Sequence, residues 1–215
     1  SALPARSEMC IRDSLGTTYT GRAVSDVMAE AFPLTATLAV LALIFEAIIG
    51  ITFGLVAGLR KGGITDSVAL VLSLLLISVP TFVVGFLVQY FLGVKWDIIP
   101  PSISGNGPWT QMIAPAAVLA SVSIANVLRL TRASVAENVG ADFVRTATAK
   151  GLSRGRVIRV HVLRNSLIPV VTYLGIDLGS LMVGAIVTEG IFNIPGVGGT
   201  VYQAVIRGAV SYTHL

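Results

Sequence analysis

Three acidic side chains lie in or beside long apolar segments of this sequence, where a charge is costly. Glu46 is near the middle of the first such segment, Asp177 is near the middle of the last, and Glu189 is close to its end. A charge at the centre of a bilayer costs about 2.5 kcal/mol or more on insertion scales, so such residues usually face a bundle interior or an aqueous path. Two interpretations stay open. Glu46 and Asp177 either line a pathway and meet a cationic group such as an ammonium, or hydrogen-bond within the packing between helices.

Residues typical of catalysis are sparse. His161 and His214 are the only histidines, and a surface or packing role is the simplest interpretation of His161 within its basic segment. The sequence contains no Walker A motif, G-x-x-x-x-G-K-[ST], through which a P-loop binds ATP. We therefore expect no catalytic residues, no metal site and no cofactor. The chain is predicted not to be an enzyme, and any ATP hydrolysis that drives it would take place in a partner subunit.

The composition indicates a membrane protein. Apolar residues make up 54% of the chain and charged residues only 12%, whereas soluble domains average about a quarter charged residues. The basic residues flank apolar segments and form no separate polar domain, which argues against a nucleic-acid partner. Cys10 is the only cysteine, so no disulfide can form within the chain.

Four apolar segments are long enough to cross a bilayer, which takes about 20 residues. They comprise residues 34–59, 67–93, 112–130 and 167–187. None alternates as the strand of a membrane barrel does, so we predict an all-α polytopic membrane protein. Pro80 falls inside the second segment and predicts a kink, which either shapes a pathway or serves packing. Ahead of the first span, residues 25–32 are predicted to form a short helix that Ser25 caps and Pro33 ends.

Basic residues predict the orientation of the spans. Arg60 and Lys61 follow the first span, and the third span is followed by eight more: Arg129, Arg132, Arg145, Lys150, Arg154, Arg156, Arg159 and Arg164. Cytoplasmic loops carry the excess of Lys and Arg. Residues 60–66 and 131–166 are therefore predicted to be cytoplasmic, whereas residues 15–33, residues 94–111 and the stretch after the fourth span are predicted to lie outside.

The second cytoplasmic loop has a helical pattern of its own. Asp142 is placed to cap a helix over residues 143–150, and Gly151 to end that helix in a left-handed turn. Ser153 is placed to cap a second helix that continues toward the fourth span. Positive-inside topology needs only the basic residues, so a pair of helices broken by glycine indicates a docking surface, with an apolar side formed by Phe143, Ala147 and Leu152.

This loop carries a resemblance to a known family, the membrane permease subunits of binding-protein-dependent ABC importers. The family signature is Glu-Ala-Ala, three residues, Gly, nine residues, then Ile-x-Leu-Pro. Aligned on Gly151, its first three positions fall on Arg145, Thr146 and Ala147, and only Ala147, Gly151 and Leu163 agree with the general form. The dipeptide, oligopeptide and nickel branch resembles this chain more closely, because it reads much like FVRTATAKGLSRGRVIRVHVLRNSLIPV throughout.

Further stretches resemble the same branch in the expected order: GRAVSDVMAEAFPLTATLAV, SVPTFVVG, LRLTRASVAENV and VTEGIFNIPGVGGTVYQAVIRG. The resemblance covers about residues 16–209. It implies a six-helix permease fold of which four helices are visible, in the cytoplasmic (inner) membrane of a bacterium or archaeon. It also implies a second homologous permease, two cytoplasmic ATP-binding subunits, an external solute-binding protein and a peptide-like solute.

The resemblance implies roles for particular residues. The loop is a coupling helix that docks on the ATPases, and its candidate coupling residues are Asp142, Arg145, Ala147, Lys150, Gly151 and Leu152. The acids and the kink within the spans, rather than the resemblance, give the candidate pathway residues Glu46, Pro80 and Asp177. The main alternative is an ion-coupled secondary transporter that uses Glu46 and Asp177. This alternative would explain the acids within the membrane, but it leaves the long basic loop without a role.

The two ends of the chain have no helical or strand periodicity and resemble translated sequencing adapter. We expect residues 1–14 and 210–215 to be foreign to the native protein. Residues 15–209 are then the permease transmembrane region, a fragment whose coupling loop is residues 131–166.

Overall fold

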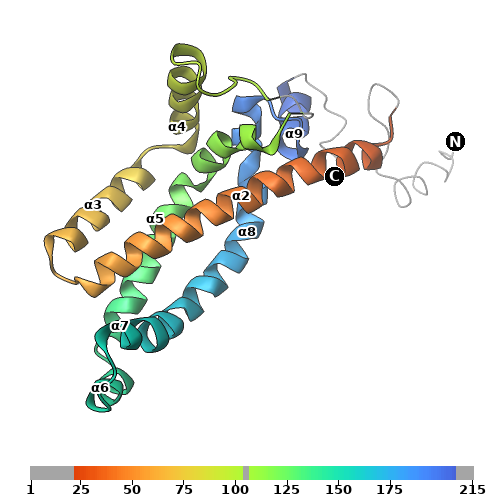
Figure 1. The fold of residues 1–215 in the computed structure, drawn as a ribbon. Helices are drawn as coiled ribbons and strands as arrows, with labels where there is room; N and C mark the ends of the chain where they lie inside the picture. Colours follow the sequence, from red (N-terminus) through yellow and green to blue (C-terminus); the bar gives the residue numbers. More distant parts are fainter. Residues whose placement is uncertain (1–21, 104–106, 207–215) are drawn as a thin grey trace, which may run out of the picture.

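A computed structural model describes residues 22–103 and 107–206. The predictions for residues 1–14 and 210–215 therefore lie outside the described residues. The described chain is mostly helical, and most of its helices are joined by short turns (Figure 1). The α-helices are α2 (Val24–Leu59), α3 (Ile64–Ser78), α4 (Thr81–Val88), α5 (Ile113–Asn138), α6 (Asp142–Ala149), α7 (Arg154–Arg156), α8 (Arg164–Phe192) and α9 (Val197–Ile206). Two π-helical segments, η1 (Gln89–Lys95) and η3 (Val157–Leu163), extend α4 and lead into α8, and a 3-10 turn, η2 (Trp109–Met112), precedes α5.

The apolar segments of the sequence correspond to membrane-crossing helices. Three helices in the described chain are long and apolar enough to span a bilayer: Val24–Leu59, Trp109–Asn138 and Arg154–Phe192. Ile64–Ser78 and Thr81–Lys95 pass the same test together but meet at 90°, so the described spans number up to four when this bent pair is one span. The break falls at Val79 and Pro80, where the sequence predicts a kink. The chain is a multi-pass membrane protein.

Helices α2 and α5 pack closely because α2 presents a stripe of glycines to its neighbour. A Cβ atom added to Gly50 would lie 2.7 Å from Val127, and one added to Gly58 would lie 2.7 Å from Val135. At Gly54 it would lie 2.6 Å from the carbonyl oxygen of Leu128. Small residues let helix backbones approach where lipid supplies no hydrophobic drive between helices. This stripe therefore fixes the position of α2 along α5.

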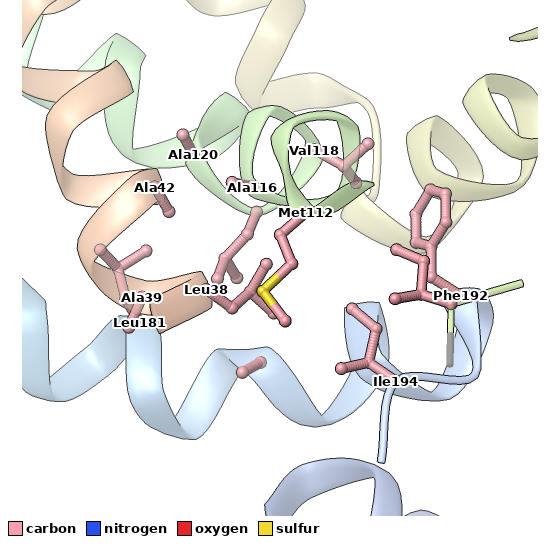
Figure 2. Packing of buried hydrophobic residues seen from close by; sticks show 13 residues of the cluster. Leu38, Ala39, Ala42, Met112, Ala116, Val118, Ala120, Leu181, Phe192 and Ile194 are labelled. Atoms are coloured by element: carbon pink, nitrogen blue, oxygen red, sulfur yellow. The ribbon is translucent and has the colours of Figure 1, made fainter. Parts of the chain in front are cut away.

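The apolar core lies toward the end of the bundle that carries α9. Leu38, Ala39 and Ala42 of α2 face residues from the start of α5 and from α8, and Phe192 and Ile194 close the cluster (Figure 2). Leu38, Ala116 and Phe192 have no exposed surface. The core therefore joins α2, α5 and α8 and leaves much of α3 and α4 outside it.

The prediction that Pro33 ends a helix is wrong. Helix α2 runs without a break from Val24 to Leu59, with Pro33 inside it. Proline removes one backbone hydrogen bond, to the carbonyl oxygen four residues earlier, and Ala29 at that position is exposed. Ala31 and Thr35, on either side of Pro33, are buried. Tertiary packing therefore holds both sides of the proline in one helix.

Candidate functional site

The loop between α5 and α8 forms the helix, glycine turn and second helix that the sequence predicts. Gly151 has a φ of +78°, which is the left-handed turn expected after α6, and its N–H donates to the carbonyl oxygen of Thr148 at 2.9 Å. The second helix runs from Arg154 through η3 into α8. The predicted cap by Asp142 is wrong, because Asp142 is the first residue of α6 and Ala141 is at its N-cap position. Ser153 is at the N-cap position of the second helix, as predicted, but its side chain makes no capping hydrogen bond.

Most of the predicted coupling residues lie together on the exposed side of this loop. Asp142, Arg145, Lys150 and Gly151 are exposed, and Leu152 is partly buried. Ala147 is buried on the opposite side of α6, with 4% of its surface exposed. The ion pair between Arg145 and Asp142 is 3.7 Å long and both side chains are solvated, so it contributes little to stability. The polar side chains of α6 are therefore available to a partner.

A groove of about 320 Å³ lies between the loop and the ends of α2 and α5. It is lined mainly by apolar residues of α6, of the second helix and of the ends of α2 and α5: Leu59, Val139, Val144, Thr148, Leu152, Arg154, Val157, Ile158 and Val162. Helix α6 contacts η3 more than any other element. The loop is therefore attached chiefly to the start of α8, so a displacement of α6 would act first on that helix.

The second candidate site is the pair of acids within the membrane. Glu46 of α2 is fully buried and Asp177 of α8 is 8% exposed, and the two carboxyl groups are close enough to interact. Within the described chain, neither oxygen of Glu46 has a hydrogen-bond partner, nor does Oδ2 of Asp177. The hydroxyl of Tyr173 donates to Oδ1 of Asp177 at 3.4 Å. The structure thus brings together two acids that are 131 positions apart and leaves three of their four oxygens unpaired.

Pro80 is exposed at the break between α3 and α4, so it does not join the acid pair. The residues after it, Thr81 and Phe82, line a groove of about 390 Å³ against α5 and α8. Ser123 of α5 lines the same groove and also lies beside Glu46. Ser123 therefore lies between the groove near Pro80 and the acid pair. The sequence pattern does not distinguish this serine from the other small residues of α5.

An ion pair at the predicted cytoplasmic end was missed from the sequence. Arg132 of α5 donates two hydrogen bonds to Asp66 of α3, at 2.8 and 2.7 Å, and the N–H of Gly62 donates to the same carboxylate at 2.9 Å. Asp66 is buried, with 3% of its surface exposed. Two-point Arg–carboxylate pairing is among the stronger polar interactions. It ties the turn after α2 to α5, close to where α5 leads into the loop.

A second cluster, at the other end of the bundle, holds the start of α9. Oε1 of Glu189 accepts a hydrogen bond from the Thr35 hydroxyl at 2.6 Å, and Oε2 accepts one from the N–H of Gly199 at 2.7 Å. The Thr35 oxygen accepts from the N–H of Val197 at 2.9 Å. We call Glu189, Thr35 and these two amides the α9 knot. The sequence analysis identified Glu189 as an acid near the end of a span. No local sequence pattern predicts its hydrogen bond with Thr35, which lies 154 residues earlier.

No group of three or more His, Cys, Asp or Glu side chains that could hold a metal ion occurs within residues 22–103 and 107–206. The candidate sites are therefore a presented loop, a buried acid pair and two polar contacts between helices.

Residues 50–214 match the family model described as "Binding-protein-dependent transport system inner membrane component". The dipeptide transport system permease protein DppB of Escherichia coli K12 is 37% identical, over 82% of this chain and 60% of its own length. DppB of Bacillus subtilis is 38% identical, over 81% and 56%. The oligopeptide transport system permease protein OppB of Haemophilus influenzae is 34% identical, over 84% and 59%. The chain thus spans about 60% of the length of these relatives.

Among solved structures, the chain resembles one described as "Crystal structure of an amino acid ABC transporter with histidines". The TM-score is 0.58 at 21% sequence identity, with 87% of this chain and 80% of the other covered. At this identity the likeness establishes a shared fold.

Proposed function

Because the chain belongs to the family of inner-membrane components of binding-protein-dependent transport systems, we propose that it is a permease subunit of an ATP-driven ABC importer. Its solute is peptide-like, a di- or oligopeptide. The permeases of known name that resemble it serve dipeptide and oligopeptide transport systems, which supports this solute class. The chain forms part of the translocation pathway in the cytoplasmic membrane of a bacterium or archaeon.

The partners follow from the same proposal. A second homologous permease completes the pathway, an external solute-binding protein delivers the peptide, and two cytoplasmic ATP-binding subunits supply the energy. The chain itself then hydrolyses no ATP, in keeping with the lack of a Walker A motif in its sequence. The exposed side of the loop, with Asp142, Arg145 and Lys150, is the surface that meets an ATP-binding subunit.

One observation carries this proposal, namely the presented helix α6 with its left-handed glycine. A loop that served only to orient the chain would need basic residues and no ordered helix pair. The buried Ala147 and the contact of α6 with η3 support a mechanical role, because they attach α6 to the start of α8. Closure of the ATP-binding subunits would move α6, and α8 would carry that movement into the membrane.

The test is co-purification of the ATP-binding subunit with the full-length permease. Gly151→Asp adds a Cβ at a φ of +78°, where side chains other than glycine are strained, and it adds a charge to the docking surface. We expect normal insertion and at least about a tenfold loss of co-purifying ATPase, equivalent to about 1.4 kcal/mol of binding free energy.

Gly155→Asp is the matched control. It adds the same side chain to the same loop, but Gly155 is exposed, has no positive φ, and its Cβ would meet only the Arg159 guanidinium at 3.9 Å. We expect this variant to retain the ATPase. Equal co-purification with Gly151→Asp and with wild type would refute the proposed docking role of the loop.

The acid pair has two candidate roles within this proposal. Glu46 and Asp177 either line the peptide pathway and meet a cationic group, or hold α2 against α8. Their unpaired oxygens also keep open the alternative function, an ion-coupled transporter. We expect Glu46→Gln and Asp177→Asn, at matched subunit levels, to lower peptide uptake if the pair lines the pathway. Unchanged uptake would eliminate the pathway role, and uptake driven by an ion gradient without ATP would favour the alternative.

A further inference from the structure

The α9 knot lies deep enough to act as a permanent attachment. Glu189 and Thr35 are buried, with 0% and 2% of their surfaces exposed. The first N–H groups of a helix have no partner within it and must find one elsewhere. In α9 two of these groups, on Val197 and Gly199, are paired with side chains from α2 and α8. Opening the knot would leave buried donors unpaired, which is costly in an apolar setting.

The glycines around the knot show that its fit is close. A Cβ added to Gly196 would lie 2.5 Å from both carboxylate oxygens of Glu189, and one added to Gly198 would lie 2.5 Å from the Cα of Ile186. At Gly190, on α8, it would lie 3.0 Å from the ring of Tyr202, which belongs to α9. The start of α9 can therefore lie against α8 only because these positions have no side chain.

Helix α8 connects this knot to the loop. The helical segment Arg154–Phe192 is continuous over 39 residues, from the π-helical η3 through α8. Helix α6 lies beyond one end of α8 and α9 lies at the other (Figure 1). Rigid secondary elements that shift between two positions are a physical means of coupling distant sites. A movement of the loop that displaces α8 would thus displace Glu189 as well.

We propose that α9 moves with α8 as one body during transport, and that Glu189 is the positioning residue that locks α9 to α8 and, through Thr35, to α2. The proposal rests on the function proposed above, because the movement originates in the ATP-binding subunits. It makes α9 a segment on the predicted external side whose position follows the state of the cytoplasmic loop.

The test measures the position of α9 in two states of the assembled transporter. A single cysteine replaces Val205, which is 73% exposed on α9, in a full-length permease in which every native cysteine is changed to serine. A membrane-impermeant maleimide then labels this cysteine from outside, without nucleotide and after trapping with ADP and vanadate. We expect the labelling rates in the two states to differ at least about threefold in an otherwise unchanged chain.

Thr35→Ala removes both hydrogen bonds of the Thr35 hydroxyl, whereas Thr35→Ser retains them. We expect Thr35→Ala to abolish the difference in labelling rate between the two states, because the α9 knot then loses the two hydrogen bonds that attach α9 and α8 to α2. Thr35→Ser should behave like wild type. Thr37→Ala is the matched control, since Thr37 is an exposed threonine on the same helix that bonds only to the carbonyl oxygen of Pro33. Glu189→Ala should have the same effect as Thr35→Ala.

Three outcomes would overturn the proposal. If Thr35→Ala keeps the wild-type rates and their difference, the knot does not hold α9. If Val205→Cys labels equally in both states while the ATPase co-purifies and traps nucleotide, α9 does not follow the loop, although the proposed function stands. If no ATPase co-purifies with the unmutated permease, both the proposed function and this inference fail.

Discussion

At one end of α8, Gly151 has a φ of +78° and no atom within 4 Å of the position a Cβ would occupy. At the other end, Gly196 and Gly198 have no positive φ, and a Cβ on either would lie 2.5 Å from a neighbouring atom. At the first site glycine is needed because the backbone has a positive φ. At the second site it is needed because there is no room for a side chain. The loop is therefore presented to its surroundings, whereas α9 is held by the helices around it.

This comparison also separates the glycines of the spans. Gly50, Gly54 and Gly58 of α2 are all in contact with α5, but Gly175 and Gly179 of α8 have no atom within 4 Å of their Cβ positions. The same residue type at the same four-residue spacing thus packs inside the chain on one helix and is open on another. Substitutions to alanine distinguish glycines packed against a neighbouring helix from glycines with open space around them.

The largest effect is expected at the α9 knot. Gly198→Ala would place a Cβ 2.5 Å from the Cα and 2.8 Å from the backbone nitrogen of Ile186, so we expect the free energy of unfolding in detergent to fall by about 2–3 kcal/mol, as for overpacked cores. Gly155→Ala, in the presented loop, should leave it within about 0.5 kcal/mol. Equal stability of the two variants, measured by denaturant titration, would break the comparison.

A smaller effect is expected at the glycine stripe of α2. Gly54→Ala would place a Cβ 2.6 Å from the carbonyl oxygen of Leu128, and we expect a loss of about 2 kcal/mol in the same titration. Gly179→Ala meets no atom and replaces a poor helix former, so it should be neutral or stabilising by up to about 1 kcal/mol. If Gly179→Ala lowered the free energy of unfolding as much as Gly54→Ala does, the Gly179 face of α8 would have to be packed against another part of the protein.

The smallest effect is expected from the two aspartates of the predicted cytoplasmic side. Asp66→Asn weakens a two-point pairing with Arg132 and should cost about 1–2 kcal/mol, because the partly buried guanidinium loses its charged partner. Asp142→Asn acts on a solvated pair 3.7 Å long and should leave the thermal unfolding midpoint unchanged. If Asp142→Asn were the more destabilising of the two, the loop would be packed against the rest of the chain and not exposed to a partner.

The outline of the fold could be predicted because it rests on local patterns. Length and hydropathy place the four apolar segments, and the structure has a helix, or the bent pair, at each. The turn at Gly151 and the break at Pro80 were predictable because each depends on the backbone preference of one residue. Capping was predicted less well. Asp142 lies one residue inside α6, and Ser153 is at its predicted N-cap position without a capping hydrogen bond, since a capping residue type permits such a bond but does not require it.

The sequence by itself determined that the chain is helical, apolar enough to span a membrane and equipped with a glycine-broken basic loop, because hydropathy and backbone preference act over a few neighbouring residues. The tertiary structure alone decided which polar groups meet. Thr35 reaches Glu189 across 154 positions and Arg132 reaches Asp66 across 66, and Pro33 stays within α2 because buried residues on both sides hold it. Such contacts depend on how helices pack, and the register of that packing is set by many small residues at once.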